Sequence, residues 1–283
     1  MLPDATVGRW SLPRKRVLRF VTQDDSGQQY FVYVPSSGGD QAPLFVAVHG
    51  ISRNGYEHAC LFSTYCEELG AVLVAPQFAE EQAGDYQRLG RVGHGPRSDA
   101  ALDSILEECA WLTGAATDRI HLFGFSGGAQ FAHRYTMAHP HRVARAVIAA
   151  AGWYTFPTTR KRFPYGIRRS RDLPHVRFDP VEFLRVPITV MVGDRDTTSV
   201  DLRCTERVNR QQGTSRVERA RNWVEAMRAS ARAHRLDPQV CFESIPGGDH
   251  SFTNLMQSGG LGERVFTALF GASFARASGG DGG

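Results

Sequence analysis

Long apolar runs are missing from this sequence of 283 residues, and none approaches the roughly 20 residues that a membrane-spanning helix needs. The first 20 residues include the basic group Arg14, Lys15 and Arg16, but Arg19 and Gln23 interrupt the stretch that follows it. A secretory signal needs an unbroken apolar region here, so none is predicted. These absences indicate a cytoplasmic protein that does not bind a membrane.

Cysteine is scarce as well. The sequence has five cysteines, an odd number, and they are scattered without CxxC or metal-ligand spacing. This excludes the disulfide framework of small secreted proteins and offers no metal site. We therefore expect no metal and reduced, mostly buried thiols at Cys60, Cys66, Cys109, Cys204 and Cys241.

The excess of positive charge is small. The 33 Lys and Arg residues, nearly all arginine, stand against 29 Asp and Glu residues and give a formal net charge of +4. No basic stripe with interleaved aromatic residues is present, so nucleic-acid binding is not expected. A content of 42% apolar and 22% charged residues is ordinary for a globular protein. The length suits a single α/β domain over residues 1–283.

What the sequence does contain is an alternation of strand and helix patterns. Strand patterns over 17–23 and 28–34 flank turn residues at 24–27 and predict an antiparallel hairpin. Short apolar runs bounded by Pro and Gly then indicate parallel strands covered on both faces. We expect these strands at 44–49, 71–75, 119–123, 143–151, 188–192 and 240–245, and helices over 57–69, from 98, over 129–138 and around 217–231. The predicted fold is α/β, a mostly parallel twisted sheet with helices on both faces. The arginine-rich face of the last of these helices is interpreted as a solvated surface.

Two insertions, 77–97 and 153–186, break this alternation. The second lies between two core strands and is too long for a simple crossover. Insertions at this place in an open α/β sheet lie above the carboxyl ends of the strands, where ligands bind, so we interpret it as an arginine-rich lid. A solvent-exposed loop that packs on the body through its aromatic residues is an equally good interpretation. Residues 278–283 have the composition of a flexible tail.

The most informative motif is the GxSxG of residues 124–128, which follows one strand pattern and precedes a helical one. A sharp strand-to-helix turn lifts a serine Oγ clear of the sheet and places backbone N–H groups beside it. Gly124 and Gly128 fit this turn, because it is strained and brings the flanking chain close. We therefore predict that Ser126 is a nucleophile.

A serine nucleophile needs a base, and a third group that holds the base in the correct tautomer. His250 follows the last strand, in a glycine-containing loop that can lean back over the turn, and is the predicted base. The acid is expected after strand 188–192, where Asp194 and Asp196 both qualify. We favour Asp196, because Asp194 can bond the backbone of its own turn. Asp249, next to the histidine, is interpreted as a residue that fixes the loop.

An oxyanion hole is also required, because charge develops on the tetrahedral intermediate. One backbone N–H is expected from Gly127, directly after the nucleophile. The second is expected from Ile51, in the turn after strand 44–49, where a neighbouring glycine lets the backbone turn inward. For the pocket wall we expect Trp153 and Tyr154, just past the strand beside the nucleophile strand, with Tyr56 as a further candidate.

Four short motifs occur in the order in which the α/β hydrolase superfamily carries its landmarks: HG at 49–50, GFSGG at 124–128, GDRDT at 193–197 and GGDHS at 247–251. Over about residues 44–270 the chain therefore resembles a serine hydrolase of that superfamily. It is more similar to the poly(3-hydroxyalkanoate) depolymerase and feruloyl esterase-like group than to the lipases, because it has a single HG and no HGGG. Secreted members of that group carry signal peptides and disulfides, and this chain shows neither sign.

The resemblance implies hydrolysis of a carboxylic ester through an acyl-enzyme, with no metal or organic cofactor. Ser126 would attack, His250 would transfer the proton, Asp196 would orient His250, and water would release the acid. The expected substrate is a small, aromatic or hydroxyalkanoate-type ester, oligomeric and polymeric esters included. The same triad serves amidases, thioesterases and acyltransferases. The alternative from another class is a non-catalytic binding protein on a hydrolase fold, against which the complete set of three residues argues.

Overall fold

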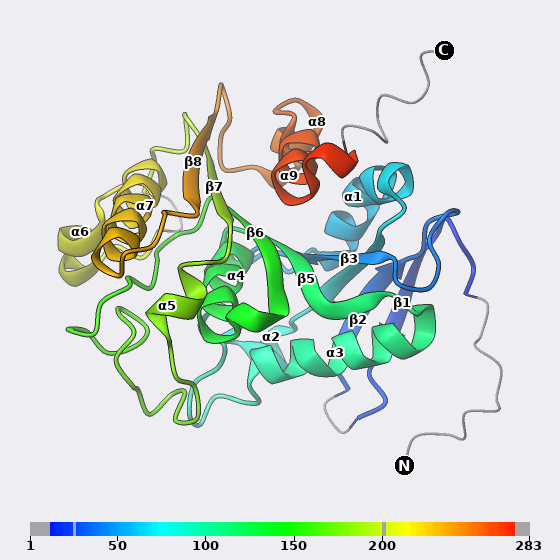
Figure 1. Ribbon diagram of the computed structural model, residues 1–283, viewed down its shortest axis with the longest axis horizontal. Coiled ribbons are helices and arrows are strands. Elements are labelled where there is room, and N and C mark those ends of the chain that lie inside the picture. Colours follow the sequence, from blue (N-terminus) through cyan, green and yellow to red (C-terminus); the bar gives the residue numbers. More distant parts are fainter. Residues whose placement is uncertain (1–11, 25–26, 200–201, 275–283) are drawn as a thin grey trace.

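Within the part of the chain that the structure describes, residues 12–24, 27–199 and 202–274 of a computed structural model, eight strands form one sheet (Figure 1). The strand order is β1-β2-β4-β3-β5-β6-β7-β8, and the pairs β1–β2 and β2–β4 are antiparallel while the others are parallel. The strands are β1 (Val17–Val21), β2 (Gln29–Tyr33), β3 (Pro43–Val48), β4 (Val72–Gln77), β5 (Ala116–Phe125), β6 (Val143–Ala149), β7 (Ile188–Gly193) and β8 (Val240–Ile245). This confirms the predicted fold class. Turn residues 25–26 and the predicted tail 278–283 lie outside the described residues.

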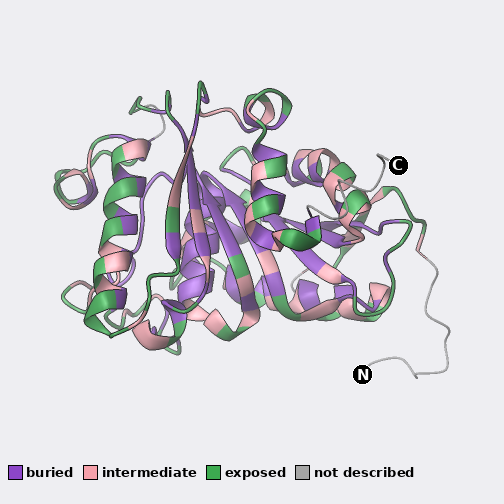
Figure 2. Ribbon diagram, turned by 45° about the horizontal axis from the view of Figure 1, so that its top comes forward, coloured by how far each residue is buried: buried purple, intermediate pink, exposed green. Residues whose placement is uncertain are grey.

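Helices cover both faces of the sheet, and each face has its own apolar core. On β3, Val46 points into a core shared with α3, α4 and α7, whereas Phe45 points into a core shared with α1, α8 and α9, because successive strand residues face opposite sides. Figure 2 shows the central strands buried along most of their length, which explains their continuous apolar sequences. The helices are α1 (Gly55–Leu69), α2 (Glu80–Ala83), α3 (Ser98–Thr113), α4 (Gly127–Ala138), α5 (Pro180–Phe183), α6 (Glu206–Gln212), α7 (Arg216–Ala233), α8 (Phe252–Gln257) and α9 (Leu261–Phe270), with 3-10 turns η1 (Tyr86–Arg88) and η2 (Pro140–Arg142). None of the described helices combines the length and the apolar character needed to cross a bilayer.

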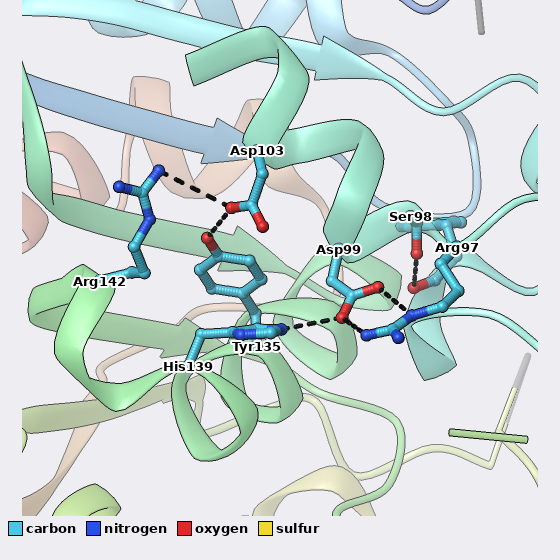
Figure 3. Close-up of polar contacts among 8 residues, drawn as sticks. Arg97, Ser98, Asp99, Asp103, Tyr135, His139 and Arg142 are labelled. Atoms are coloured by element: carbon cyan, nitrogen blue, oxygen red, sulfur yellow. Dashed lines mark hydrogen bonds and ion pairs between the residues drawn. The ribbon is translucent and has the colours of Figure 1, made fainter. Parts of the chain in front are cut away.

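A polar cluster ties α3 to the far end of α4 (Figure 3). Asp99, in the first turn of α3, is buried and accepts hydrogen bonds from Arg97 Nε at 3.0 Å and His139 Nε2 at 2.8 Å. Burial alone would raise the pKa of Asp99, but the bonds and charges of His139 and Arg97 outweigh it and lower that pKa. One turn on, Asp103 accepts from Tyr135 Oη at 2.7 Å. Because α4 begins at the GxSxG motif, these bonds brace the helix on which the candidate site is built.

Helix α7 differs from the prediction in one respect. Its apolar face is buried as expected, but Arg216 and Arg219 are buried too, with exposed fractions of 2% and 0%. Arg219 donates to the backbone carbonyls of Gly213 at 3.0 Å and Gly152 at 2.6 Å, so it joins α7 to the loop after β6. For these two arginines the interpretation as a solvated surface is wrong, because the helix packs this side against loops that offer acceptors.

The five cysteines are all free. Cys66 and Cys109 are buried, Cys60 is half-buried, and Cys204 and Cys241 are exposed. The prediction of mostly buried thiols is therefore wrong. Cys241 lies on β8, one of the two edge strands of the sheet, where a side chain is less covered by neighbouring elements.

The insertion 153–186 packs beside α6 and α7, toward the left of Figure 1. Trp223 of α7 donates its indole N–H to the carbonyl of Thr155 at 2.7 Å, and the Thr155 hydroxyl donates to the carbonyl of Pro164 at 2.7 Å. No residue of the insertion lines the cavity at Ser126 described below. That cavity therefore gives the lid interpretation no support.

Candidate active site

Ser126 occupies the turn between β5 and α4 with φ 52° and ψ −107°, in the left-handed region that a residue with a side chain rarely adopts. The turn depends on two glycines. A Cβ on Gly124 would lie 2.2 Å from the carbonyl oxygen of Gly128, and a Cβ on Gly128 would lie 2.0 Å from that of Val48. The Ser126 N–H donates to the carbonyl of Ala149 on β6 at 2.8 Å. The serine is thus held at the end of the sheet in a fixed, strained conformation.

The structure brings three predicted residues together from the carboxyl ends of β5, β7 and β8. Ser126 Oγ lies 3.1 Å from Nε2 of His250, in the loop after β8. Nδ1 of the same ring lies 2.7 Å from Oδ2 of Asp196, just past β7. The Asp196 carboxylate can only accept, so Nδ1 carries the proton and Nε2 is left to accept from the Ser126 hydroxyl. The imidazole also stacks on Phe125, with ring centroids 5.3 Å apart.

The two alternative acids serve the loop that carries the histidine. Asp194 Oδ1 accepts from the N–H of Gly247 at 2.9 Å. Asp249 accepts from the N–H of Ser251 at 2.9 Å and from Nδ2 of Asn254 at 3.1 Å. Asp249 therefore fixes the loop, as interpreted from the sequence, and Asp194 fixes it from the neighbouring turn rather than bonding its own. Geometry leaves Asp196 as the carboxylate that faces His250.

Sequence reasoning missed Arg216. Its Nη1 lies 3.1 Å from Oδ1 of Asp196, and the exposed fractions of the two side chains are 2% and 0%. Asp196 thus accepts from His250 with one oxygen and from Arg216 with the other. The signal was present in the periodicity, because Arg216 precedes Ala220 and Val224 at intervals of four and so falls on the apolar stripe of α7.

The two predicted oxyanion donors lie close together. A Cβ built on Gly127 would be 3.2 Å from the backbone nitrogen of Ile51. Among the described residues, neither the Gly127 N–H nor the Ile51 N–H donates a hydrogen bond to the rest of the chain. Both are therefore available to an oxygen atom placed beside Ser126 Oγ.

His49 holds the turn that presents Ile51. Its Nδ1 lies 2.7 Å from the carbonyl oxygen of Gly50, and its Nε2 accepts from the N–H of Phe78 at 3.0 Å. Burial lowers the pKa of His49 to about 4, so the ring is neutral, with the proton on Nδ1. The Tyr86 hydroxyl donates to the His49 carbonyl at 3.0 Å. Neither His49 nor Tyr86 had been predicted in this role.

The cavity at Ser126 has a volume of about 270 Å³. None of the three predicted pocket residues lines it. Trp153 is 4% exposed, Tyr154 is fully buried, and Tyr56 is 57% exposed and packs on Phe31. The walls of the cavity come from the turn after β3, from the end of β5 with the nucleophile, and from the His250 loop with the start of α8. The lining residues are Gly50, Ile51, Ser52, Asn54, Phe125, Ser126, His250, Phe252 and Thr253. No set of three or more His, Cys, Asp or Glu side chains within the described residues is placed to hold a metal ion.

Solved structures share this architecture. Poly(aspartic acid) hydrolase-1 from Sphingomonas sp. KT-1 matches with a TM-score of 0.75 and 23% identity, over 90% of this chain and 100% of that one. The poly(3-hydroxybutyrate) depolymerase LpqC from Bordetella parapertussis matches with a TM-score of 0.74 and 25% identity, over 93% and 94%. An S-formylglutathione hydrolase from Agrobacterium tumefaciens matches with a TM-score of 0.60 and 15% identity, over 89% and 94%. No protein-family model and no curated protein matches the chain.

The sheet order and these likenesses show that the chain has the α/β hydrolase fold, and its predicted resemblance to serine hydrolases of this fold is confirmed. The class that fold and site define together is that of α/β-fold hydrolases.

Proposed function

We propose that the protein is a serine carboxylic ester hydrolase that works through an acyl-enzyme. The observation that carries this proposal is the line of hydrogen bonds from Ser126 Oγ to His250 Nε2 at 3.1 Å and from His250 Nδ1 to Asp196 at 2.7 Å. A serine hydrogen-bonded to a base, beside two backbone N–H groups that have no partner in the described part of the chain, is what acyl transfer requires.

In this proposal Ser126 Oγ attacks the substrate carbonyl carbon while its proton moves to Nε2 of His250. The oxygen that becomes negatively charged accepts from the N–H groups of Gly127 and Ile51, each of which is worth about 3 kcal/mol to the transition state. Asp196 stabilises the imidazolium that forms. His250 then protonates the leaving alcohol, and the same steps with water as nucleophile release the acid and restore the serine.

Several of the neighbours are named for ester substrates, whereas poly(aspartic acid) hydrolase-1 is named for a polymer with amide bonds. LpqC is a poly(3-hydroxybutyrate) depolymerase, and two further structures that share the fold are esterases. The cavity of about 270 Å³, walled by Phe125 and Phe252, suits a short or aromatic acyl group. We therefore propose a short-chain, aromatic or hydroxyalkanoate-type ester as the substrate.

A fluorophosphonate probe tests the nucleophile, because it reacts only with an activated serine. The parent protein and a Ser63→Ala variant, which removes a serine of α1, should both be labelled. Ser126→Ala should not be labelled, and His250→Ala should react far more slowly. Labelling of Ser126→Ala equal to that of the parent would remove Ser126 from this role.

Turnover of p-nitrophenyl butyrate tests the bond type when it is compared with the matching anilide and thioester. We expect kcat/KM for the ester to exceed that for the anilide by several orders of magnitude. Negligible ester turnover beside rapid anilide or thioester turnover would replace the esterase proposal with an amidase or a thioesterase.

A further inference from the structure

Three arginines surround the ring of Trp153. The guanidinium carbons of Arg134, Arg203 and Arg88 lie 4.3, 5.5 and 5.6 Å from its ring centroid. They come from α4, from the loop before α6 and from η1, so separate parts of the chain converge on one indole. None of the three forms an ion pair with an acid among the described residues. Arg203 is exposed and Arg88 is half-buried, so water solvates these two charges, whereas Arg134 is shielded from water.

Arg134 carries the least compensated of these charges. It is fully buried, and its Nε donates to the hydroxyl of Thr155 at 3.0 Å. Its Nη2 is buried without a hydrogen-bond partner in the described part of the chain. Burial lowers the pKa of Arg134 well below its usual value, and the charges of Arg88 and Arg203 add to this effect. A buried cation with no counter-charge is costly, so a negative charge nearby would be strongly favoured.

A second aromatic ring, that of Tyr165, lies beside Trp153 and also has an arginine stacked on it. Tyr165 lies 5.4 Å from Trp153 between ring centroids, and the guanidinium carbon of Arg207 lies 4.0 Å from the Tyr165 centroid. Arg203 also reaches the Tyr165 hydroxyl, at 3.5 Å. Trp153 and Tyr165 thus form an aromatic spine with cations on its sides.

This spine leads to a cavity of about 420 Å³ between the insertion 153–186 and α6. The cavity is lined by Lys161, Glu206, Arg207, Arg210 and Gln211. Glu206 is the one acid in that lining and is already paired with Arg210. Lys161 and Arg207 have no acid partner within the described residues. Partial burial and the charge of Arg207 together lower the pKa of Lys161, so this cavity too has an excess of positive charge.

The buried Arg134, which stacks on Trp153, links the row of cations to the helix that begins beside the candidate nucleophile. Arg134 donates to the Gln130 carbonyl at 3.3 Å, and the Gln130 N–H donates to the Ser126 carbonyl at 3.2 Å. Arg134 lies two turns of α4 from Ser126, a distance of about 12 Å along the helix axis. A substrate that reaches from Ser126 to the accessible cations around Trp153 must therefore be an extended molecule.

We propose that the row Arg88, Arg203, Arg207 and Lys161, with the charge of the buried Arg134 behind it, binds the carboxylates of an extended substrate, an oligomeric or polymeric ester whose repeating units each bear a negative charge. Planar guanidinium groups bind carboxylates through paired, charge-assisted hydrogen bonds, and stacking on rings orients them. This proposal rests on the proposed ester hydrolysis and adds the class of substrate. Ser126 cleaves the ester bond, while the cation row holds the rest of the chain.

Poly(malic acid) tests this proposal, because it is a polyester with one carboxylate on each unit; oligomers of 3-hydroxybutyrate have the same type of ester bond with uncharged units. Arg203→Gln and Arg207→Gln remove exposed cations of the row, and Arg232→Gln removes an exposed cation of α7 outside it. We expect each row variant to raise KM for poly(malic acid) about fivefold, as for the loss of one exposed charge contact, with the double variant higher still. Turnover of p-nitrophenyl butyrate should stay within twofold of the parent in all variants. Added NaCl should raise KM for the charged polymer only.

Binding separates the cation row from the catalytic proposal. Poly(malic acid) should bind to Ser126→Ala in a calorimetric titration, more weakly when Arg203→Gln and Arg207→Gln are added, and more tightly than citrate. This pattern would support the cation row whether or not p-nitrophenyl butyrate is hydrolysed. Absence of that hydrolysis would overturn the esterase proposal alone. The substrate proposal is overturned if the row variants behave like Arg232→Gln, if citrate binds as tightly as the polymer, or if 3-hydroxybutyrate oligomers are cleaved with a KM as low as that of poly(malic acid).

Discussion

Arg216 donates a hydrogen bond to the carboxylate of Asp196 at 3.1 Å, and both side chains are buried. The candidate catalytic acid therefore sits between two cationic or potentially cationic groups, because its other oxygen faces His250 at 2.7 Å. Two donors fix the plane of the carboxylate more firmly than one. We infer that Arg216 positions Asp196, and through it the imidazole that faces Ser126.

Replacement of Arg216 by Met should destabilise the fold and lower activity. Removal of one partner of a buried ion pair costs about 3–5 kcal/mol, because the other charge stays buried. Urea unfolding should show this loss, while Arg232→Met, an exposed change on the same helix, should change the unfolding free energy by less than about 0.5 kcal/mol. Arg216→Lys keeps a charge and should recover part of both stability and kcat. Parent-like stability and kcat for Arg216→Met would show that the pair does not position the acid.

Asp196→Asn and Asp194→Asn should differ sharply. Both oxygens of Asp196 accept hydrogen bonds, and an amide has only one acceptor oxygen, so Asn leaves either Arg216 without its partner or His250 in the wrong tautomer. We expect kcat for p-nitrophenyl butyrate to fall about 10³- to 10⁴-fold. Asp194 accepts a single N–H, which an amide oxygen can also accept, so Asp194→Asn should keep kcat within a few fold. A larger loss in Asp194→Asn than in Asp196→Asn would reverse the assignment of the acid.

Gly127→Ala should damage the oxyanion site without unfolding the protein. The new Cβ would lie 2.5 Å from the hydroxyl of Tyr86 and 2.9 Å from Cγ2 of Ile51, so the turn that presents the Ile51 N–H must move. Loss of one oxyanion donor lowers kcat about 100- to 1000-fold. Gly39→Ala is the matched control, because its Cβ would meet nothing within 4 Å. Thermal unfolding should be measured together with kcat. A Gly127→Ala variant that unfolds at a much lower temperature than the parent would show that its activity is lost through unfolding and not through damage to the oxyanion site.

Acid should destabilise the protein between about pH 6.5 and pH 4. Burial lowers the pKa values of His49 and His121 to about 4 and those of His58 and His133 well below 6.5. As the pH falls, the unfolded chain binds these protons before the folded chain does. The free energy of unfolding is therefore highest above pH 6.5 and decreases below it, by about 1.4 kcal/mol per pH unit for each histidine. Urea midpoints measured from pH 7.5 to pH 5 should show this slope.

His58 offers a direct check of that slope. Both of its ring nitrogens are buried without a partner among the described residues, and the ring stacks on Phe252 at 3.7 Å. His58→Leu should therefore reduce the dependence on pH and should be more stable than the parent at pH 5, because no unpaired polar group is buried. His94→Gln, at an exposed position, should leave the slope unchanged. Equal slopes in the two variants would contradict a role for buried histidines.

The fold and the approach of Ser126, Asp196 and His250 could be predicted because local chemistry determines them. Apolar runs between Pro and Gly mark buried parallel strands, and parallel strands end at the same edge of a sheet. The end of β5 was harder to predict, because glycine has poor strand propensity. The strand nevertheless continues through Gly124 and Phe125, which pair with Ile148 and Ala149 of β6.

The pocket and the arginine partner of the acid could not be predicted in the same way. Tyr154 follows a strand beside the nucleophile, as a pocket residue should, but it stacks on Trp223 of α7 at 5.0 Å and is buried there. Phe252 lines the cavity instead, because the start of α8 places its ring beside Phe125, with ring centroids 5.5 Å apart. Both outcomes depend on how distant segments pack, which no local pattern encodes. Arg216 was missed although a local pattern does indicate its burial. Its position on the apolar stripe of α7 predicts a buried side chain, whereas its charge alone suggests a solvated one.

The backbone of Ser126 is strained, with a φ of 52°. The conformation that exposes its hydroxyl for reaction therefore lowers the stability of the fold at the same residue. A residue with a side chain pays about 1–3 kcal/mol for such a conformation, and glycine adopts it without that cost. Ser126→Gly should thus give a chain that is more stable and chemically inert. A lineage released from the need for the reaction would gain stability by losing this serine early, so its retention in a folded descendant would itself report that the chemistry is still in use.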